Sequence, residues 1–154
     1  MTPRRAGPQD APAIARLNAH LQAWHAAHYP EAFFPRSDPA ALLAHFVQRL
    51  ADPAVTVFLT GDPPLGYALC SLQTREASIF SPPVRRLMVE HVAVSPEARR
   101  QGHGRALLRA ARGLGRELQV HEILLDTWEA NHEAHAFFRA EGFTPRRMLF
   151  RATP

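Results

Sequence analysis

Apolar residues recur every three to four positions in two stretches near the N-terminus, which predicts two helices that each bury one face. In the first stretch the apolar stripe consists of Ile14, Leu17, Leu21 and Trp24. This helix is predicted to begin at Asp10, a residue type favoured at the N-cap, and to end near His28. The second helix is predicted from Asp38 to Leu50. Residues 29–38 between them form a predicted loop rich in aromatic residues.

Short apolar runs separated by turn residues predict the strands. The predicted strands cover residues 4–6, 54–60, 65–73 and 85–94, with a turn signal at Gly61-Asp62-Pro63-Pro64 that favours a hairpin. Further along, a helix is predicted over 102–118, a strand over 123–128, a helix over 132–141 and a last strand over 144–151. Helices that gather early and late around a mostly antiparallel sheet predict one α+β domain, residues 1–154.

A turn rich in glycine and arginine connects the strand ending at Val94 to the helix beginning near Gly102. Gly102 and Gly104 carry no side chain, so several backbone N–H groups are free to converge at the helix N-terminus. These amides and the positive end of the helix dipole favour an anion, most often a phosphate. Three arginines add positive charge around the turn: Arg99, Arg100 and Arg105. The turn therefore predicts a phosphate site, suited to a diphosphate.

Two common phosphate motifs do not fit this turn. The dinucleotide fingerprint needs a third glycine at a fixed offset, and none follows Gly104. A P-loop needs a Lys-Ser or Lys-Thr pair, which is missing after the turn. On spacing alone, the glycines are as compatible with a tight connection as with a phosphate site.

The flanking residues resemble the acetyl-CoA motif of the GNAT superfamily of N-acetyltransferases. The shared pattern is Arg99-x-x-Gly102-x-Gly104, preceded by Val92-x-Val94 and Pro96. The family's order of helix, strand, Asn, helix and Gly-Phe pair continues here through Asn131 to Gly142-Phe143, so the resemblance covers about residues 85–150. It implies acetyl-CoA as cosubstrate and a mostly antiparallel sheet with a splayed strand pair at the cofactor site. The cofactor-binding residues it implies are Val92, Ala93, Val94, Arg99, Arg100, Gln101, Gly102, His103, Gly104, Arg105 and Asn131.

Composition limits the cellular compartments in which we expect this protein. Apolar residues make up 46% of the chain, which excludes a disordered protein, and no apolar run is long enough to span a membrane. The N-terminal Met-Thr-Pro-Arg-Arg lacks the apolar core of a secretory signal, and the single cysteine, Cys70, allows no internal disulfide. These features predict a cytoplasmic protein. Cys70 lies in an apolar run and is expected in the core rather than as a nucleophile.

The basic charge leaves a second class of function open. All 18 basic residues are arginines, and the formal net charge is +4. The arginines are spread along the chain without the aromatic pattern of an RNA-recognition motif, so we expect no nucleic-acid binding. The alternative is a basic module that binds nucleic acid or a ribosome-associated partner and carries a vestigial CoA site.

Acetyl transfer to an amine needs aligned reactants, a neutral amine and a donor for the developing oxyanion. Glu90 is the predicted proton acceptor, because apolar surroundings raise the pKa of a carboxylate. Strand alternation puts it on the face of Val92 and Val94. In some GNAT enzymes a Glu at the matching position acts through water. The alternatives are a structural Glu90 paired with an arginine, or His91 in its place if a β-bulge reorients the strand.

Phe138 departs from the family pattern. Many relatives carry a Tyr where Phe138 aligns, and its hydroxyl protonates the departing CoA thiolate. Phe138 has no hydroxyl, and neither Tyr29 nor Tyr67 lies at the matching place, so the acid stays unassigned. Asn131 is expected to cap the following helix, a role compatible with the CoA contact that the resemblance implies.

Two histidine pairs have the i, i+3 spacing of a helical chelate: His25 with His28, and His132 with His135. Neither pair has a third ligand at a suitable spacing, so no metal is expected. The acceptor is predicted to be a primary amine, small or peptidyl, with protein N-termini as an alternative. The resemblance puts specificity in the first two helices and their loop, residues 24–36, whose aromatic rings suit an apolar or cationic amine. A homodimer is implied by the resemblance only.

Overall fold

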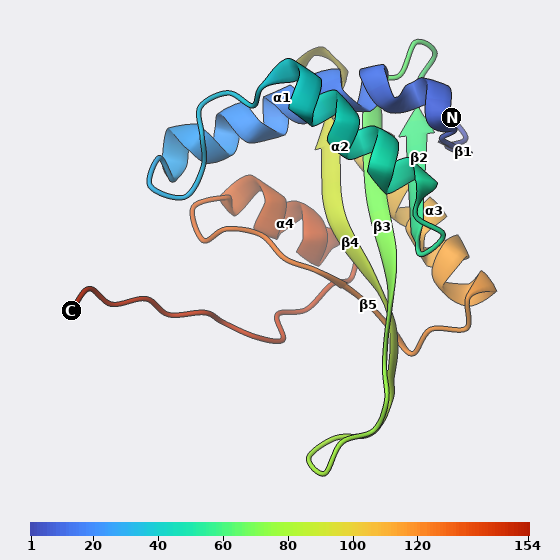
Figure 1. Cartoon of the computed structure of the whole chain (residues 1–154), viewed down its shortest axis with the longest axis vertical. Coiled ribbons are helices and arrows are strands. Elements are labelled where there is room, and N and C mark those ends of the chain that lie inside the picture. The colour runs from blue at the N-terminus through green and yellow to red at the C-terminus, as the bar shows by residue number, and fades with distance from the viewer.

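The computed structural model describes residues 1–154 as a five-stranded sheet with helices on both faces (Figure 1). In chain order the elements are β1 (Arg4–Arg5), α1 (Ala11–His28), α2 (Pro39–Ala51), β2 (Val55–Thr60), β3 (Gly66–Arg75), β4 (Val84–Val94), α3 (His103–Glu117), β5 (Glu122–Leu125) and α4 (His132–Ala140), with 3₁₀ turns at Pro8–Asp10 and Pro96–Ala98. Strands neighbour one another in sequence order, and every pair is antiparallel except the parallel pair β4–β5. The predicted α+β class and mostly antiparallel sheet are confirmed.

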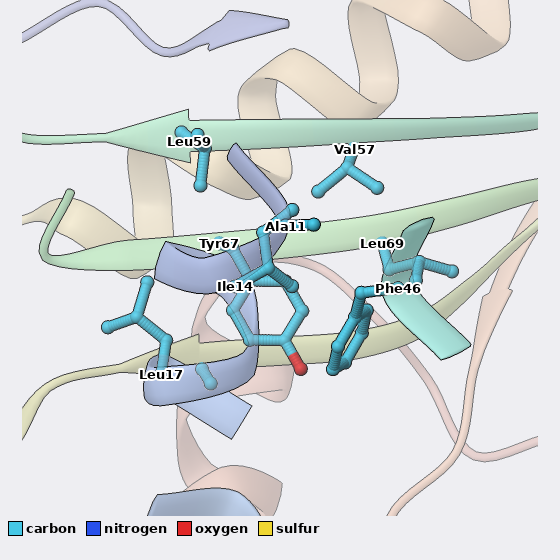
Figure 2. Packing of buried hydrophobic residues seen from close by; sticks show 9 residues of the cluster. Ala11, Ile14, Leu17, Phe46, Val57, Leu59, Tyr67 and Leu69 are labelled. Atoms are coloured by element: carbon cyan, nitrogen blue, oxygen red, sulfur yellow. The ribbon is translucent and has the colours of Figure 1, made fainter. Parts of the chain in front are cut away.

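Each face of the sheet carries its own apolar core. α1 and α2 cover one face, where Figure 2 shows Ile14, Leu17 and Phe46 packed over Leu59, Tyr67 and Leu69 of the strands. α3 covers the other face, where Leu107, Ala111 and Leu114 pack against strand residues that include Cys70 and Val89. No helix combines the length and hydropathy that crossing a membrane requires.

Cys70 is a core residue, as its apolar run predicts. Its side chain is fully buried in the cluster beneath α3. Burial raises the pKa of the Cys70 thiol to about 12, so the thiol stays protonated at neutral pH. A protonated buried thiol is a poor nucleophile, which is consistent with a packing role.

Asp10 lies at the N-cap of α1 as predicted, but its carboxylate does not bond to the first amides of the helix. It accepts hydrogen bonds from the backbone N–H of Gly7 at 2.8 Å and from the Arg4 guanidinium at 2.7 and 2.8 Å. The bonds from Arg4 hold the pKa of Asp10 below its ordinary value. The residue therefore joins β1 to α1 rather than capping the helix.

Two strand predictions near the C-terminus are wrong. β5 ends at Leu125, three residues before the predicted end at Trp128, and residues 144–151 form no strand. The backbone of the whole segment 144–154 makes no hydrogen bond, and Figure 1 shows it running away from the body of the molecule. Both differences have one cause, because a strand needs a neighbouring backbone and none is present at these positions within the chain.

The separate core beneath α3 gives a stability prediction. Leu107 is fully buried there, so Leu107→Ala should lower the free energy of unfolding by about 2–5 kcal/mol through lost burial and a cavity. The matched control is Leu43→Ala, because Leu43 on α2 is 38% exposed, and its cost should stay below about 1 kcal/mol. Urea unfolding followed by circular dichroism measures both. Equal losses would contradict the position of this core.

Candidate functional site

The turn between β4 and α3 presents a row of free backbone amides. Arg100 and Gly102 both have left-handed backbone angles, with φ of 62° and 88°. The six N–H groups from Arg100 to Arg105 donate no hydrogen bond within the protein. Successive amides in such a turn form an anion-binding concavity, which lies here at the positive end of a 15-residue helix. The turn therefore has the backbone geometry of a phosphate site.

The two glycines of the turn have different reasons to be glycine. Gly102 is the N-cap of α3 and needs its positive φ, since other residues are strained there. Gly104 has an ordinary φ, but a Cβ on it would lie 3.0 Å from Cζ of Phe137. Gly104 therefore allows α3 and α4 to pack closely, a packing role in addition to its free N–H.

The side chains around the turn divide into engaged and free groups. Arg100 pairs with Glu133 of α4 at 3.1 Å, and Arg105 pairs with Glu141 at 2.7 Å. Arg99 makes no ion pair and is exposed. The other two side chains are held by the protein itself: exposed Gln101 donates to the Glu97 carbonyl at 2.9 Å, and buried His103 lies beside Thr60 at 3.1 Å. Arg99 is thus the free cation of the turn. Gln101 and His103 contribute only their backbone amides to the proposed anion site.

β4 and β5 separate at the end of their shared ladder. Their pairing runs from Arg86 with Glu122 to Val89 with Leu125 and stops there. β4 continues to Val94 and stays paired with β3 on its other edge. The three residues Val92, Ala93 and Val94 therefore have no strand beside them on the β5 side, which leaves a backbone edge free for an extended ligand.

A pocket of about 250 Å³ lies where the two strands diverge. Its walls come from α1, the loop after α1, β4, the end of β5 and α4. The lining residues are Asn18, Leu21, Gln22, His25, Phe33, Val89, Glu90, His91, Val92, Leu125, Asp126, Thr127, Trp128, Asn131, Ala134 and Phe138. The pocket brings together four residues that are far apart or in different elements along the sequence. They are Glu90 and His91 of β4, Asn131 before α4 and Phe138 in α4.

A β-bulge in β4 changes the expected direction of Glu90. Leu69 lies opposite His91 and Cys70 opposite Val89, so Glu90 has no partner on β3. As a result Val89 and Val92 both pack in the core beneath α3, although they are three positions apart. The prediction that Glu90 shares the face of Val92 and Val94 is wrong, because the bulge turns Glu90 and His91 together toward α1 and α2.

Glu90 also has a charged neighbour in place of purely apolar surroundings. Its carboxylate accepts a hydrogen bond from the Arg49 guanidinium of α2 at 2.7 Å, and both side chains are partly exposed. The arginine partner that the structural alternative requires is therefore present. The pair fixes the carboxylate at the pocket wall, so a structural and a chemical role are compatible.

His91 ends a hydrogen-bonded chain that starts at α1. The Asn18 amide donates to the Tyr67 hydroxyl at 2.9 Å, and that hydroxyl lies 3.0 Å from His91 Nδ1. Tyr67 is fully buried, and burial raises the pKa of its hydroxyl, which keeps it protonated. Burial also lowers the pKa of His91. The β-bulge on which the alternative role of His91 depends is present, and His91 lines the pocket.

Asn131 and the aromatic residues complete the pocket. Asn131 caps α4 as predicted, with its side chain accepting a hydrogen bond from the Ala134 N–H at 3.1 Å. Elsewhere in the lining, the ring of Phe33 stacks on His25 with centroids 4.5 Å apart and meets Trp128 edge-on at 5.2 Å. No cluster of His, Cys, Asp and Glu has the geometry to hold a metal ion, and His28 stacks on Trp24 instead.

The sequence did not single out Asn18 or Arg49, although both leave a signal in it. Asn18 follows Ile14 by four residues and so lies on the apolar stripe of α1. Arg49 follows Phe46 by three residues on the buried side of α2. A polar residue on an apolar helix face needs a partner, and that requirement points toward the site.

The chain matches the family model described as acetyltransferase (GNAT) family over residues 18–143. Its fold is similar to the tetramutant of the BH1408 protein from Bacillus halodurans, with a TM-score of 0.91 and 21% identity over 100% of both chains. It is also similar to the aminoglycoside N-acetyltransferase AAC(6')-Iy in complex with CoA, with a TM-score of 0.77 and 19% identity over 98% of this chain and 93% of that chain. AAC(6')-Iy in complex with the bisubstrate analog CoA-S-monomethyl-acetylneamine gives a TM-score of 0.76 and 19% identity over 99% and 97%. No curated protein sequence matches.

The family match covers most of the chain and includes both the pocket and the glycine turn, since it begins at Asn18 and ends at Phe143. The structural similarities, at about one residue in five identical, establish the shared fold. The resemblance seen in the turn sequence is therefore confirmed over a wider region than the motif itself. The chain is an acyltransferase that belongs to the acetyltransferase (GNAT) family.

Proposed function

We propose that this protein moves the acetyl group of acetyl-CoA to a primary amine by direct attack of the amine nitrogen. The observation that carries the proposal is the row of six unpaired amides from Arg100 to Arg105, which suits the diphosphate of CoA. The free edge of β4 at Val92–Val94 continues from this row toward the pocket and suits the amides of the CoA arm. When bound, acetyl-CoA supplies an activated acetyl group, which the amine takes in exchange for the CoA thiol.

Arg99 gives the test of the CoA site, because it is the cation of the turn without a partner. Hydrogen bonds to charged groups contribute about 1.5–3 kcal/mol, so Arg99→Gln should raise the Kd for CoA by about ten- to a hundredfold. Isothermal titration calorimetry measures the change. For the unmodified protein, acetyl-CoA at 100 times its Kd should add about 2.7 kcal/mol of stability and raise the Tm.

The matched control is Arg116→Gln, at the far end of α3, which is exposed and has no ion pair. Its Kd for CoA should equal that of the unmodified protein. If both variants bind CoA as the unmodified protein does, Arg99 is not a phosphate ligand. If millimolar acetyl-CoA leaves the Tm of the unmodified protein unchanged, acetyl-CoA does not bind and the proposed cosubstrate is wrong.

Glu90 is the proposed proton acceptor. An alkyl ammonium with a pKa near 10.4 is only about four parts in ten thousand neutral at pH 7, so a nearby carboxylate that accepts its proton speeds the attack. Glu90 lines the pocket with its carboxylate oriented by Arg49, which supports proton transfer directly or through a water.

His91 is proposed as the donor that compensates for Phe138. The Tyr67 hydroxyl accepts from Asn18, so its single proton is best placed on Nδ1 of His91. The imidazole then carries its own proton on Nε2 and acts as a donor in the pocket. This donor is suited to the departing thiolate or to the acyl oxygen, which is the role that the missing tyrosine leaves open.

Glu90→Gln should lower kcat by about 10²–10⁴-fold while the Kd for acetyl-CoA stays within about twofold, because only proton transfer is lost. The amide keeps an oxygen for Arg49, so folding is preserved. The defect should shrink as the pH rises toward the amine pKa. Initial rates of CoA release between pH 6.5 and 9.5 measure it.

Glu129→Gln is the matched control, since Glu129 is exposed near the pocket without lining it. Its kcat should be unchanged. A Glu90→Gln variant with normal kcat at neutral pH would show that Glu90 is not the proton acceptor. His91 would then be the next candidate, and the same pH series on His91→Gln would test it.

The proposed acceptor is a small cationic amine with an apolar body. Asp126 lines the pocket without an ion-pair partner and supplies negative charge, while Phe33 and Trp128 offer ring faces. The limited volume of about 250 Å³ favours a small amine over an extended peptide, the alternative acceptor.

An amine panel tests this acceptor class. We expect kcat/KM to be highest for amines with a hydrophobic group a few bonds from the nitrogen, and at least about tenfold lower for peptides with free N-termini, a difference of about 1.4 kcal/mol. Rates of CoA release across both sets provide the measurement. A preference for peptides would assign the protein to N-terminal acetylation instead.

A further inference from the structure

A buried hydrogen-bonded chain reaches the pocket from the core and plays no part in proton transfer at Glu90. It runs from the Asn18 amide of α1 through the Tyr67 hydroxyl of β3 to Nδ1 of His91 on β4, with distances of 2.9 and 3.0 Å. Tyr67 is fully buried and Asn18 is 8% exposed. A polar chain in a core is costly wherever a member lacks a partner, so the direction in which each member donates matters.

Aromatic packing holds the chain in one geometry. Phe46 of α2 lies edge-on to Tyr67, as Figure 2 shows, and edge-on to His91, with ring centroids 6.1 and 6.3 Å apart. The rings of Tyr67 and His91 are perpendicular to each other, with centroids 5.9 Å apart. The imidazole is therefore packed on one side and bonded at Nδ1, which leaves only Nε2 for other partners.

Nε2 of His91 is open to the pocket. This atom makes no hydrogen bond within the protein, yet it is not enclosed, because the only buried side-chain nitrogen or oxygen without a partner is Oγ of Ser95. His91 is also one of the residues that line the pocket. A group bound in the pocket can therefore reach Nε2 directly.

Asn18 decides which nitrogen of His91 carries the proton, although the two residues do not touch. The Asn18 amide donates to the Tyr67 oxygen, so the one proton of that hydroxyl is left to bond Nδ1. Nδ1 is then an acceptor, and the proton of the neutral imidazole lies on Nε2. The direction of the whole chain is set at its first member.

The surroundings of His91 favour a neutral ring. The charged and titratable groups that face it are Glu90 on its own strand, Tyr67 on β3, His45 and Arg49 on α2, and His25 on α1. Burial lowers the pKa of His91 more than Glu90 raises it, and His45, Arg49 and His25 lower it further.

A neutral His91 donates a hydrogen bond but does not give its proton away. Loss of the Nε2 proton would leave an anionic ring. Tyr67 cannot replace that proton, because burial raises the pKa of its hydroxyl. This restriction separates the two roles that are open to the donor. Stabilising a developing oxyanion needs only a hydrogen bond, whereas protonating the departing sulfur needs a proton to be transferred.

We propose that Asn18 and Tyr67 are positioning residues that hold His91 as a neutral donor, and that Nε2–H of His91 bonds to the acetyl oxygen during the transfer. The inference rests on the proposed function and assigns the step in which His91 acts. It also accounts for Phe138, since no acid is needed at the sulfur if the leaving group departs as a thiolate, whose thiol has an ordinary pKa of about 8.5.

The step balances without a proton from His91. The amine nitrogen forms its bond to the carbonyl carbon, and the C=O electron pair moves onto the oxygen, where Nε2–H donates to it. The pair then returns, the C–S bond breaks, and its electrons leave with the sulfur as a thiolate. Glu90 takes the proton that the nitrogen loses, so His91 and Tyr67 keep theirs throughout.

Asn18→Asp reverses the chain and gives the first test. A carboxylate only accepts, so it takes the Tyr67 proton, the Tyr67 oxygen then accepts from Nδ1–H of His91, and Nε2 loses its proton. Long-range ¹H–¹⁵N NMR of the ¹⁵N-histidine protein at pH 9, without any substrate, distinguishes the two tautomers. The His91 signals are assigned by their absence in His91→Gln. We expect the Nε2–H form in the unmodified protein and the Nδ1–H form in Asn18→Asp.

The matched control is Asn131→Asp, at the only other asparagine of the chain. It makes the same chemical change and adds the same charge at the pocket wall, and Asp also caps helices, but Asn131 bonds to Ala134 rather than to the chain. His91 should keep the Nε2–H form in this variant. A tautomer that switches in both variants would show an effect of charge alone and would overturn the role of Asn18.

Kinetics test the acetyl oxygen as the partner of Nε2. Losing one oxyanion donor costs about 10²–10³-fold in kcat, so Asn18→Asp should lower kcat and kcat/KM by that factor while the Kd for acetyl-CoA stays within about twofold. The kcat of the unmodified protein should not fall between pH 7 and pH 9. An acid at His91 would have to be an imidazolium, and kcat would then fall as the pH rises through the pKa of His91.

The outcomes separate this inference from the proposed function. An Nδ1–H ring in the unmodified protein, or a tautomer that Asn18→Asp leaves unchanged, refutes the inference, and the first result decides even if Asn18→Asp does not fold. A switched tautomer with normal kcat refutes the role at the acetyl oxygen. If no amine is acetylated by the unmodified protein, the proposed function fails, while the NMR comparison still decides whether Asn18 positions His91.

Discussion

The end of pairing between β4 and β5 determines the geometry of the site. The two strands share a ladder only as far as Val89 and Leu125, and the unpaired Glu90 then bulges from β4. Beyond this point β4 keeps one free edge, β5 turns away into the pocket wall, and α4 follows on its far side. A ladder that continued by three residues would fill both the free edge and the pocket. The candidate site is thus formed where the sheet stops making hydrogen bonds between β4 and β5.

Local chemistry made much of this arrangement predictable from sequence. Gly102 is required by a backbone conformation that few other residues tolerate, and Asn131 caps a helix through its own side chain. Such features depend on neighbours within a few residues, so a sequence motif expresses them directly. The same holds for the apolar stripes of α1 and α3, which face the cores that their spacing indicates.

The features that sequence reasoning missed depend on distant segments. The bulge is a property of β3 and β4 together. One extra residue in a strand reverses the face of every side chain after it, so simple alternation along β4 predicts one face for Glu90 and Val92 where the structure has two. Arg49 reaches Glu90 across 41 residues, and Asn18 reaches Tyr67 across 49. The strand over 144–151 fails for a related reason. Its composition is that of a strand, but strand formation also needs a neighbouring backbone, and none is present there.

The pair of Arg49 and Glu90 also has a chemical consequence that rests on the identity of its cation. All seven ion pairs of the structure use arginine, and the sequence contains no lysine. A lysine at position 49 would place a primary amine next to the carboxylate that we propose accepts the proton of the substrate amine. That lysine would compete with the substrate for the acetyl group. A guanidinium keeps its charge, offers no free electron pair and cannot be consumed in this way. Under the proposed role of Glu90, its charge is therefore balanced by a group that acetyl transfer leaves intact.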